Sequence, residues 1–408
     1  MPQDKPVGRR GAVSRAVTCC LALVLLAGCS GSGTQPAPGS AAADSTTDSS
    51  GRPAASRGPA RVAEISAAVT TALDLALDAG ERYDKLIKSV LVTVDGQAVY
   101  ERYSADSGPD VTHNAYSVTK SVMSMLIGIA IDEGAISGVD RTLAQLLPDY
   151  VPIMAPGVGQ VTLEQVLTMT GGILDDDTAD TWFIDVPDWV TDILSTPMGQ
   201  PAGTGFAYSS RGSHLLAAIL QQATGQPVLD FAREKLFHPM GIATEPADQS
   251  HVPISDLPAY DRTPGFGWST DPQGLNLGFS DLKITAPDMV KLGRLYLDGG
   301  QWQGAQVVPA AWVATSTTNR LADTDPNSGY GYQWWVFDSG GHPAFAAMGH
   351  AGQLIHVVPD LGLVVAVSCL DGSARFDGAS FASIVETYVI PAIESRGIDG
   401  VQDGVPSS

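Results

Sequence analysis

Ser117 and Lys120 are residues whose types and spacing could carry out chemistry together. On an α-helix, residues three positions apart share a face, so the lysine amine could reach the serine hydroxyl. Serine alone is a weak nucleophile and needs a neighbouring base. Lysine can be that base only if burial or another cation lowers its pKa towards neutral, and the apolar run that follows, up to Ala130, could bury it. The alternative is a polar first turn of a core helix.

A second S-x-x-K pattern is formed by Ser280 and Lys283, so the spacing alone does not identify a site. The two patterns differ in context. Ser117 opens a strongly apolar helix, whereas Ser280 lies in a glycine-rich stretch just before a helix that is predicted to start at Thr285. The context favours Ser117 and Lys120 as the catalytic pair.

Tyr208 lies in a glycine-bounded loop, Gly205–Gly212, that precedes an apolar helix. A tyrosine in such a loop can shuttle protons if nearby cations stabilise its phenolate. The alternative is an ordinary half-buried tyrosine.

The segment Gly349–Gln353 comes just before an apolar strand and contains His350 and Gly352. Glycine lets a ligand approach the backbone closely, and backbone N–H groups there could bind an oxyanion. The alternative is a tight turn that carries a surface histidine.

Several other kinds of site are disfavoured by the sequence. The chain has no G-x-S-x-G nucleophile elbow, no H-E-x-x-H, no cysteine cluster, and seven scattered histidines. These absences argue against an α/β-hydrolase and against a zinc enzyme, so we expect neither metal nor cofactor. A net charge of −21 makes nucleic acid an improbable partner.

The predicted elements that must position these residues form an α+β pattern. Asp95-Gly96 between two β-rich runs predicts a hairpin, and strands at both ends of the folded region must pair across a mainly helical block. This predicts a mostly antiparallel sheet flanked by the terminal helices, with an inserted all-helical subdomain and a cleft between them. The expected order is a helix at 61–79, a hairpin at 89–103, the Ser117 helix, a helical block at 140–245, a helix at 285–297, three strands at 331–337, 354–358 and 363–368, and a helix at 379–393.

The N-terminal region has the pattern of an export signal. Basic residues precede an apolar stretch that ends in Leu26-Ala27-Gly28-Cys29, which resembles a bacterial lipobox. We therefore expect a lipoprotein signal peptide at 1–28, lipid on Cys29, and an extracytoplasmic protein anchored to the membrane. An ordinary signal peptide is the alternative. Residues 29–60, rich in Ser, Gly, Ala and Pro, predict a flexible tether; 61–396 predict one folded unit, and 397–408 a disordered tail.

Taken in order, Ser117-x-x-Lys120, Tyr208-Ser209-Ser210 and His350-Ala351-Gly352 resemble the three motifs of the serine β-lactamase and penicillin-binding-protein superfamily. The similarity covers about residues 85–395. It extends to phrases found in β-lactamase-related hydrolases, which include class C β-lactamases, esterases of that fold and 6-aminohexanoate-dimer hydrolases. Those phrases are Leu167–Gly172, Pro201–Thr204, Val307–Val313, Tyr330–Trp335 and Val357–Asp360.

The resemblance implies acyl transfer through a serine ester. Ser117 would attack a carbonyl, Lys120 would take its proton, and Tyr208 would act as partner base and then as acid. The backbone N–H groups of Ser117 and Gln353 would form the oxyanion hole.

Two departures from the motifs affect substrate binding. Ser210 stands where β-lactamases usually have asparagine, and His350 where they usually have lysine. A lysine cation is thereby replaced by a group that is mostly neutral at pH 7. With Gly352, these positions would face the substrate. Asp175, after the Gly171-Gly172 turn, could attract a substrate amine or belong to a solvated loop.

We therefore expect a secreted serine hydrolase of small esters or amides. The alternatives are a D-amino-acid peptidase or weak β-lactamase acting near the cell wall, and a non-catalytic binding lipoprotein of the same fold.

Overall fold

The structure of the protein, a computed structural model, describes residues 58–78, 87–174, 186–253, 256–321, 329–370 and 382–398. The expected signal peptide, Cys29, the tether as far as residue 57, Asp175 and the tail from residue 399 lie outside these ranges.

An antiparallel sheet of six strands in the order β2-β1-β11-β10-β9-β8 forms the centre of the fold. The hairpin between the first two strands has the predicted two-residue turn, with Asp95 at φ 50° and Gly96 at φ 74°. Because β1 pairs with β11, the two ends of the folded region meet in one sheet, as expected. The strands are β1 (Ile87–Val94), β2 (Gln97–Tyr103), β8 (Trp335–Ser339), β9 (His342–Gly349), β10 (Gln353–Val358) and β11 (Leu363–Cys369).

Four strands of the central sheet follow the helical block, and the prediction of three was wrong. The missed strand, β9, has the sequence HPAFAAMG, with no β-branched residue and one proline. Alanine and proline are depleted in strands, so the local pattern gave no strand signal. β9 is nevertheless held between β8 and β10. The predicted strand at 331–337 begins only at Trp335, because Gln333 has a left-handed φ of 62°.

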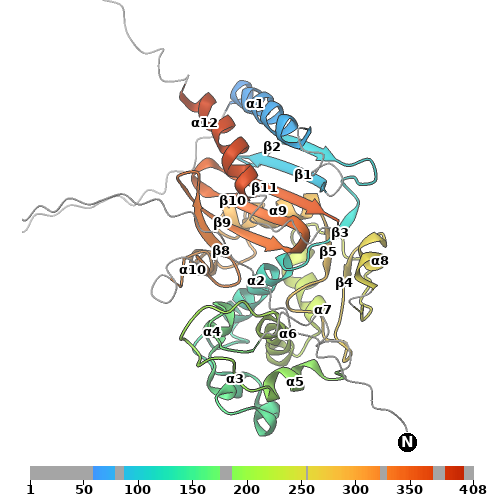
Figure 1. The fold of residues 1–408 in the computed structure, drawn as a ribbon, viewed down its shortest axis with the longest axis vertical. Helices are drawn as coiled ribbons and strands as arrows, with labels where there is room; N and C mark the ends of the chain where they lie inside the picture. The colour runs from blue at the N-terminus through green and yellow to red at the C-terminus, as the bar shows by residue number, and fades with distance from the viewer. Residues whose placement is uncertain are drawn as a thin grey trace, which may run out of the picture. The chain divides into compact units, whose positions relative to one another are not determined.

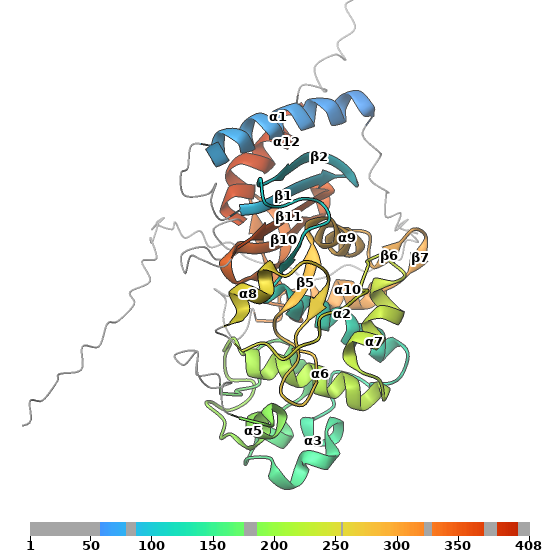
Figure 2. The ribbon, with the colours of Figure 1, turned by 90° about the vertical axis from the view of Figure 1, so that its right-hand side faces the viewer.

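Helices cover both faces of the sheet (Figure 1, Figure 2). On one face lie α1 (Pro59–Asp78) and α12 (Ile390–Ile398), the latter preceded by a π-helical turn at Val385–Val389; on the other lie α9 (Ala286–Leu297) and α2 (Val118–Asp132). Val365 and Val367 belong to the core under α1, whereas Val364 and Ala366 belong to the core under α2 and α9. Because both faces are buried, the inner strands are continuous apolar runs rather than alternating ones.

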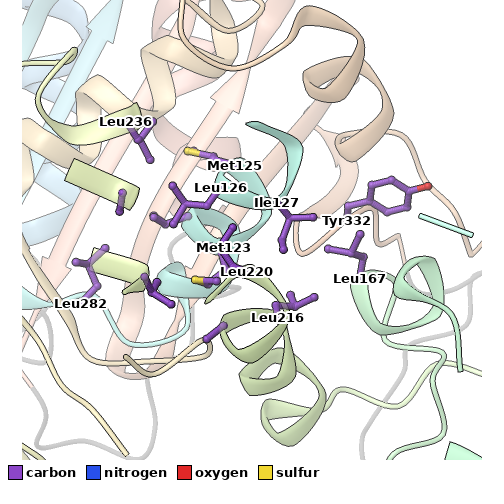
Figure 3. Close-up of a cluster of buried hydrophobic side chains, with 14 of the residues drawn as sticks. Met123, Met125, Leu126, Ile127, Leu167, Leu216, Leu220, Leu236, Leu282 and Tyr332 are labelled. Atoms are coloured by element: carbon purple, nitrogen blue, oxygen red, sulfur yellow. The ribbon is translucent and has the colours of Figure 1, made fainter. Parts of the chain in front are cut away.

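The helical block packs against α2 on the side away from the sheet. Every residue of α2 from Val118 to Ala130 is buried. Figure 3 shows Met123 and Ile127 of α2 in one cluster with leucines of α4 and α6. The block contains α3 (Leu143–Leu146), α4 (Leu163–Leu167), α5 (Trp189–Ser195), α6 (Ser210–Thr224) and α7 (Val228–Ala232). Within the described ranges, no helix has both the length and the apolarity needed to cross a membrane.

A small second sheet, which the sequence did not predict, lies beside the start of α2. Its strands are β3 (Thr112–Asn114), β5 (Leu282–Thr285) and β4 (Gly267–Trp268), in that order. The N–H of Ala115 donates to the carbonyl of Leu282 at 2.8 Å. This pairing brings residues 279–283 next to Ser117. The remaining elements are α8 (Leu257–Arg262), the hairpin β6 (Gln301–Trp302) and β7 (Ala305–Gln306), and α10 (Ala310–Ser316).

His342 links the C-terminal helix to the sheet through two carboxylates. Its Nδ1 lies 2.7 Å from Asp360 in the β10–β11 turn, and its Nε2 lies 3.1 Å from Glu394 in α12. The hydrogen bond to Asp360, with that to Glu394, raises the pKa of His342 above 6.5. The charged imidazolium form of His342 is thus favoured in the folded state. Its contribution to the stability of the fold is fully present below the pKa of the unfolded state, and is lost as the pH rises through the raised pKa of the folded state.

We therefore expect His342→Gln to lower the free energy of unfolding by about 0.5–1 kcal/mol at pH 5.5 and by much less at pH 9, since exposed ion pairs contribute little. Urea unfolding of both proteins at the two pH values measures the difference. An equal loss at both values would show that charge on His342 is not the cause.

Candidate active site

The turn that carries Ser117 is held in a left-handed backbone conformation. Ser117 is the N-cap of α2, and the preceding Tyr116 has a φ of 45°. The fully buried Asn114 fixes this turn: its Oδ1 accepts from the Tyr116 N–H at 2.8 Å, and its Nδ2 donates to Asp281 at 2.9 Å. Non-glycine residues adopt this conformation at a cost, which is commonly met at functional sites. The serine is thereby presented, half-buried, at the mouth of the helix.

Lys120 is 1% exposed and donates to three neutral oxygens. Its Nζ lies 3.0 Å from Ser117 Oγ, 3.2 Å from Ser210 Oγ and 3.1 Å from the carbonyl of Phe279. The predicted contact between the two residues of the first S-x-x-K pattern is therefore present. The Ser210 hydroxyl contacts the lysine amine, and the expectation that Ser210 also faces the substrate stays a prediction.

Tyr208 reaches the same lysine from the start of α6. Ser209 caps that helix by accepting from the Gly212 N–H at 2.9 Å, which starts the helix immediately after the tyrosine. Nζ of Lys120 lies 4.8 Å from the centre of the Tyr208 ring. The ring stacks on Trp335, with centroids 5.9 Å apart and planes at 15°. This stacking fixes the plane of the phenol beside Lys120.

The turn between β9 and β10 lies directly against the nucleophile's backbone. A Cβ on Gly349 would come within 2.5 Å of the Ala115 carbonyl and 3.2 Å of the Ser117 nitrogen, so only glycine allows this approach. The exposed ring of His350 lies edge-on to Tyr116, at 5.4 Å between centroids. The third motif therefore lies at the nucleophile, and His350 is placed where it could meet a substrate. Gly352 follows in the same turn, at φ 101°.

Gln353 is anchored more firmly than its sequence context indicated. Its side chain clamps the end of β11: Nε2 donates to the Cys369 carbonyl at 2.6 Å, and Oε1 accepts from the Cys369 N–H at 3.1 Å. Its own backbone N–H donates to the His350 carbonyl. An oxyanion bound as the sequence predicts would have to share or replace that bond, so the oxyanion-hole role of Gln353 stays a prediction.

The second S-x-x-K pattern does not form a serine–lysine pair. Lys283 lies in a strand, and its amine donates to the carbonyl of Tyr260 at 2.8 Å and to that of Thr263. Ser280 donates to Asp281 at 2.7 Å. Burial raises the pKa of the Asp281 carboxyl, against the opposing effects of Asn114, Ser280 and the charge of Lys120. The segment 280–283 thus supports the nucleophile turn.

Two of these supporting groups could not be identified from the sequence. The Phe279 acceptor is a backbone carbonyl, which has no residue signature, and an asparagine shortly before a serine does not by itself indicate a supporting contact. Across the parts of the chain that the structure describes, no three His, Cys, Asp or Glu side chains are grouped as metal ligands would be.

Comparisons with known proteins agree with this geometry. A profile of the family described as Beta-lactamase matches residues 81–379. The chain is 29% identical over 282 residues to penicillin-binding protein 4 of Amycolatopsis lactamdurans, covering 65% of this chain and 74% of the relative. It is 29% identical over 299 residues to a 6-aminohexanoate-dimer hydrolase of Paenarthrobacter ureafaciens, covering 63% and 66%.

The fold also matches solved structures. A D-amino acid amidase from Ochrobactrum anthropi SV3, complexed with L-phenylalanine amide, superposes with a TM-score of 0.61 over 81% of this chain and 99% of its own, at 18% identity. At that identity the likeness concerns the fold alone. It confirms the α+β class, with an antiparallel sheet and a helical block.

Proposed function

The chain belongs to the Beta-lactamase family, a family of serine hydrolases, and from that premise we propose that it cleaves small esters or amides through an acyl-enzyme on Ser117. One observation supports this more than any other. The amine of the buried Lys120 lies 3.0 Å from the hydroxyl of Ser117, within the range needed for proton transfer.

The proposed reaction has two halves. In the proposed mechanism Lys120 enters as the free amine, so the Ser117 hydroxyl donates to Nζ. As Ser117 Oγ attacks the substrate carbonyl, this proton passes to Nζ, and the carbonyl oxygen becomes an oxyanion near the Ser117 N–H. Collapse of the tetrahedral intermediate breaks the bond to the leaving group, which takes a proton from Tyr208, and Lys120 then returns its extra proton to the Tyr208 phenolate. Water attacks the ester on Ser117 and gives a proton to the Lys120 amine, which passes it to Ser117 Oγ as the acid leaves, so that all three groups return to their starting state.

The residues around the serine favour an uncharged, apolar substrate. Ser210 Oγ accepts from Lys120 at 3.2 Å and supplies no amide group. His350 supplies no permanent cation for a carboxylate. Beside Tyr208, the rings of Phe206, Tyr330 and Trp335 pack with one another, with centroids 5.0–6.1 Å apart. An apolar acyl or leaving group would bury surface against the half-buried rings of Phe206 and Trp335.

A labelling experiment tests the proposal. The protein is incubated with a fluorophosphonate probe, and the modified residue is mapped by mass spectrometry. We expect a single adduct on Ser117. An adduct on Ser280, or none under conditions in which a serine esterase is labelled, would refute the proposed nucleophile.

A substrate panel then separates the candidate activities. We expect p-nitrophenyl esters of apolar acids and linear amides to be hydrolysed faster than nitrocefin. A D-amino-acid peptidase is the second candidate, because relatives of similar fold include a D-amino acid amidase and a penicillin-binding protein. Faster turnover of D-alanyl peptides than of esters would favour it, and fast nitrocefin turnover would contradict our interpretation of Ser210 and His350.

We also propose that the protein is exported and anchored by lipid on Cys29. The support is the sequence Leu26-Ala27-Gly28-Cys29 after a basic and apolar segment. In a bacterial host, the wild-type protein is expected in the membrane fraction with an acylated N-terminal cysteine, and Cys29→Ala in the soluble fraction. Unchanged membrane partitioning of the variant would refute the anchor without affecting the proposed chemistry.

A further inference from the structure

His214 and Asp271 form a fully buried pair outside the three motifs. Both side chains have 0% exposure, and His214 Nε2 lies 3.2 Å from Asp271 Oδ2. The N–H of Gly278 donates to His214 Nδ1 at 3.4 Å. Since Nδ1 accepts, a ring proton is on Nε2 and points to the carboxylate, so this network favours one of the two tautomers of the ring.

The pair holds the loop that approaches Lys120. Asp271 Oδ1 also accepts from the N–H groups of Gln273 and Leu275, both at 2.9 Å, and so closes the turn before Gly278. Gly278 lies against the backbone of α6, where a Cβ would come within 2.4 Å of the Ser213 carbonyl. The next residue, Phe279, packs its ring edge-on against His214 at 5.9 Å.

That loop ends in a direct contact with the base. The Phe279 carbonyl accepts from Lys120 Nζ at 3.1 Å. Ser210, which also accepts from Nζ, lies four residues before His214 in α6, so the two side chains share one face of the helix. One face of α6 thus contacts Lys120 directly through Ser210. The same face acts on Lys120 indirectly, because His214 packs on Phe279, whose carbonyl accepts from the lysine.

We propose that His214 is a positioning residue for Lys120: by accepting from Gly278 and packing on Phe279, it fixes the carbonyl that orients the lysine amine towards Ser117. Asp271 serves this role by fixing the tautomer. The inference rests on the proposed function. The proposed reaction needs Nζ of Lys120 to be placed accurately relative to Ser117 Oγ, because a misplacement of about 1 Å can cost roughly 100-fold in rate.

Two near-isosteric variants separate positioning from packing. In His214→Asn the amide oxygen occupies the place of Nδ1 and can still accept from Gly278. In His214→Gln the amide nitrogen can still donate to Asp271, but the acceptor for Gly278 is lost. We expect kcat to fall about 10- to 100-fold in His214→Gln, with KM within about twofold of wild type, and to stay within about threefold in His214→Asn.

The rate of fluorophosphonate labelling at Ser117 should fall in parallel with kcat, because it needs the same base. A double-mutant cycle with Ser210→Ala adds a test that packing alone would not pass: two residues acting through one amine should give non-additive losses. If His214→Gln does not fold, Asp271→Asn replaces it, and we expect slower labelling there too.

The outcomes are distinct. Wild-type protein that labels at Ser117 while the folded His214→Gln and Asp271→Asn variants label equally fast would overturn the positioning role alone. Equal losses in His214→Gln and His214→Asn would do the same, because the retained acceptor would then make no difference. Wild-type protein that does not label at Ser117 would overturn the proposed function and this inference with it.

Discussion

Replacing Ser117 by alanine should lower kcat for the best ester substrate by roughly 10⁴- to 10⁶-fold, as expected for loss of a covalent nucleophile. The half-buried hydroxyl is the only group that the proposed mechanism uses to form the acyl-enzyme, and it accepts from Lys120 at 3.0 Å. Alanine at a helix N-cap whose side chain makes no capping hydrogen bond should cost little stability. Steady-state kinetics, fluorophosphonate labelling and urea unfolding measure the three quantities.

Ser280→Ala is the matched control, because Ser280 opens the other S-x-x-K pattern. Its hydroxyl donates to Asp281, whereas the hydroxyl of Ser117 accepts from Lys120. The control should label at Ser117 and keep kcat within about threefold, consistent with the loss of one hydrogen bond outside the reacting groups. Residual hydrolysis by Ser117→Ala at a tenth of the wild-type rate would mean that another group is the nucleophile.

The order of the elements and the approximate place of the site could be predicted from sequence, because both depend on strong local signals. The Asp95-Gly96 turn needs two residues with positive φ, which this residue pair readily adopts. The apolar helix after Ser117 is buried on all sides, so the expected burial of Lys120 followed from composition alone.

What could not be predicted depends on contacts between distant segments. β9 forms a strand because β8 and β10 pair with it on either side, not because its alanines favour one. The sequence indicates only that Gly349 belongs to a turn. In the structure its lack of a side chain lets the end of β9 approach the Ser117 nitrogen. From the sequence, Ser210 could be seen only as a replacement for the asparagine that is usual in the second motif. The contact of its hydroxyl with Lys120 is visible only in the structure.

Replacing Lys120 by methionine is expected to lower kcat and the labelling rate at Ser117 by about 10³- to 10⁴-fold, near the upper range for removal of a general base. Methionine preserves the length of the side chain but cannot accept the serine proton. The carbonyl of Phe279 and the hydroxyl of Ser210 each lose the hydrogen bond from Lys120, which destabilises the fold. The fold no longer has to bury a polar amine, which stabilises it. Since the two effects oppose one another, the free energy of unfolding should change by less than about 2 kcal/mol.

Lys283→Met gives the opposite pattern and is therefore the informative comparison. This second buried lysine donates to two backbone carbonyls, including Tyr260 at 2.8 Å, and makes no contact with Ser280 that would pair it as a base. Its replacement should destabilise the fold, because two carbonyls lose their partner, yet the folded fraction should label at Ser117 near the wild-type rate. If instead Lys120→Met labels normally and Lys283→Met does not, the base is not Lys120, and the serine must be activated from the other side of the small sheet.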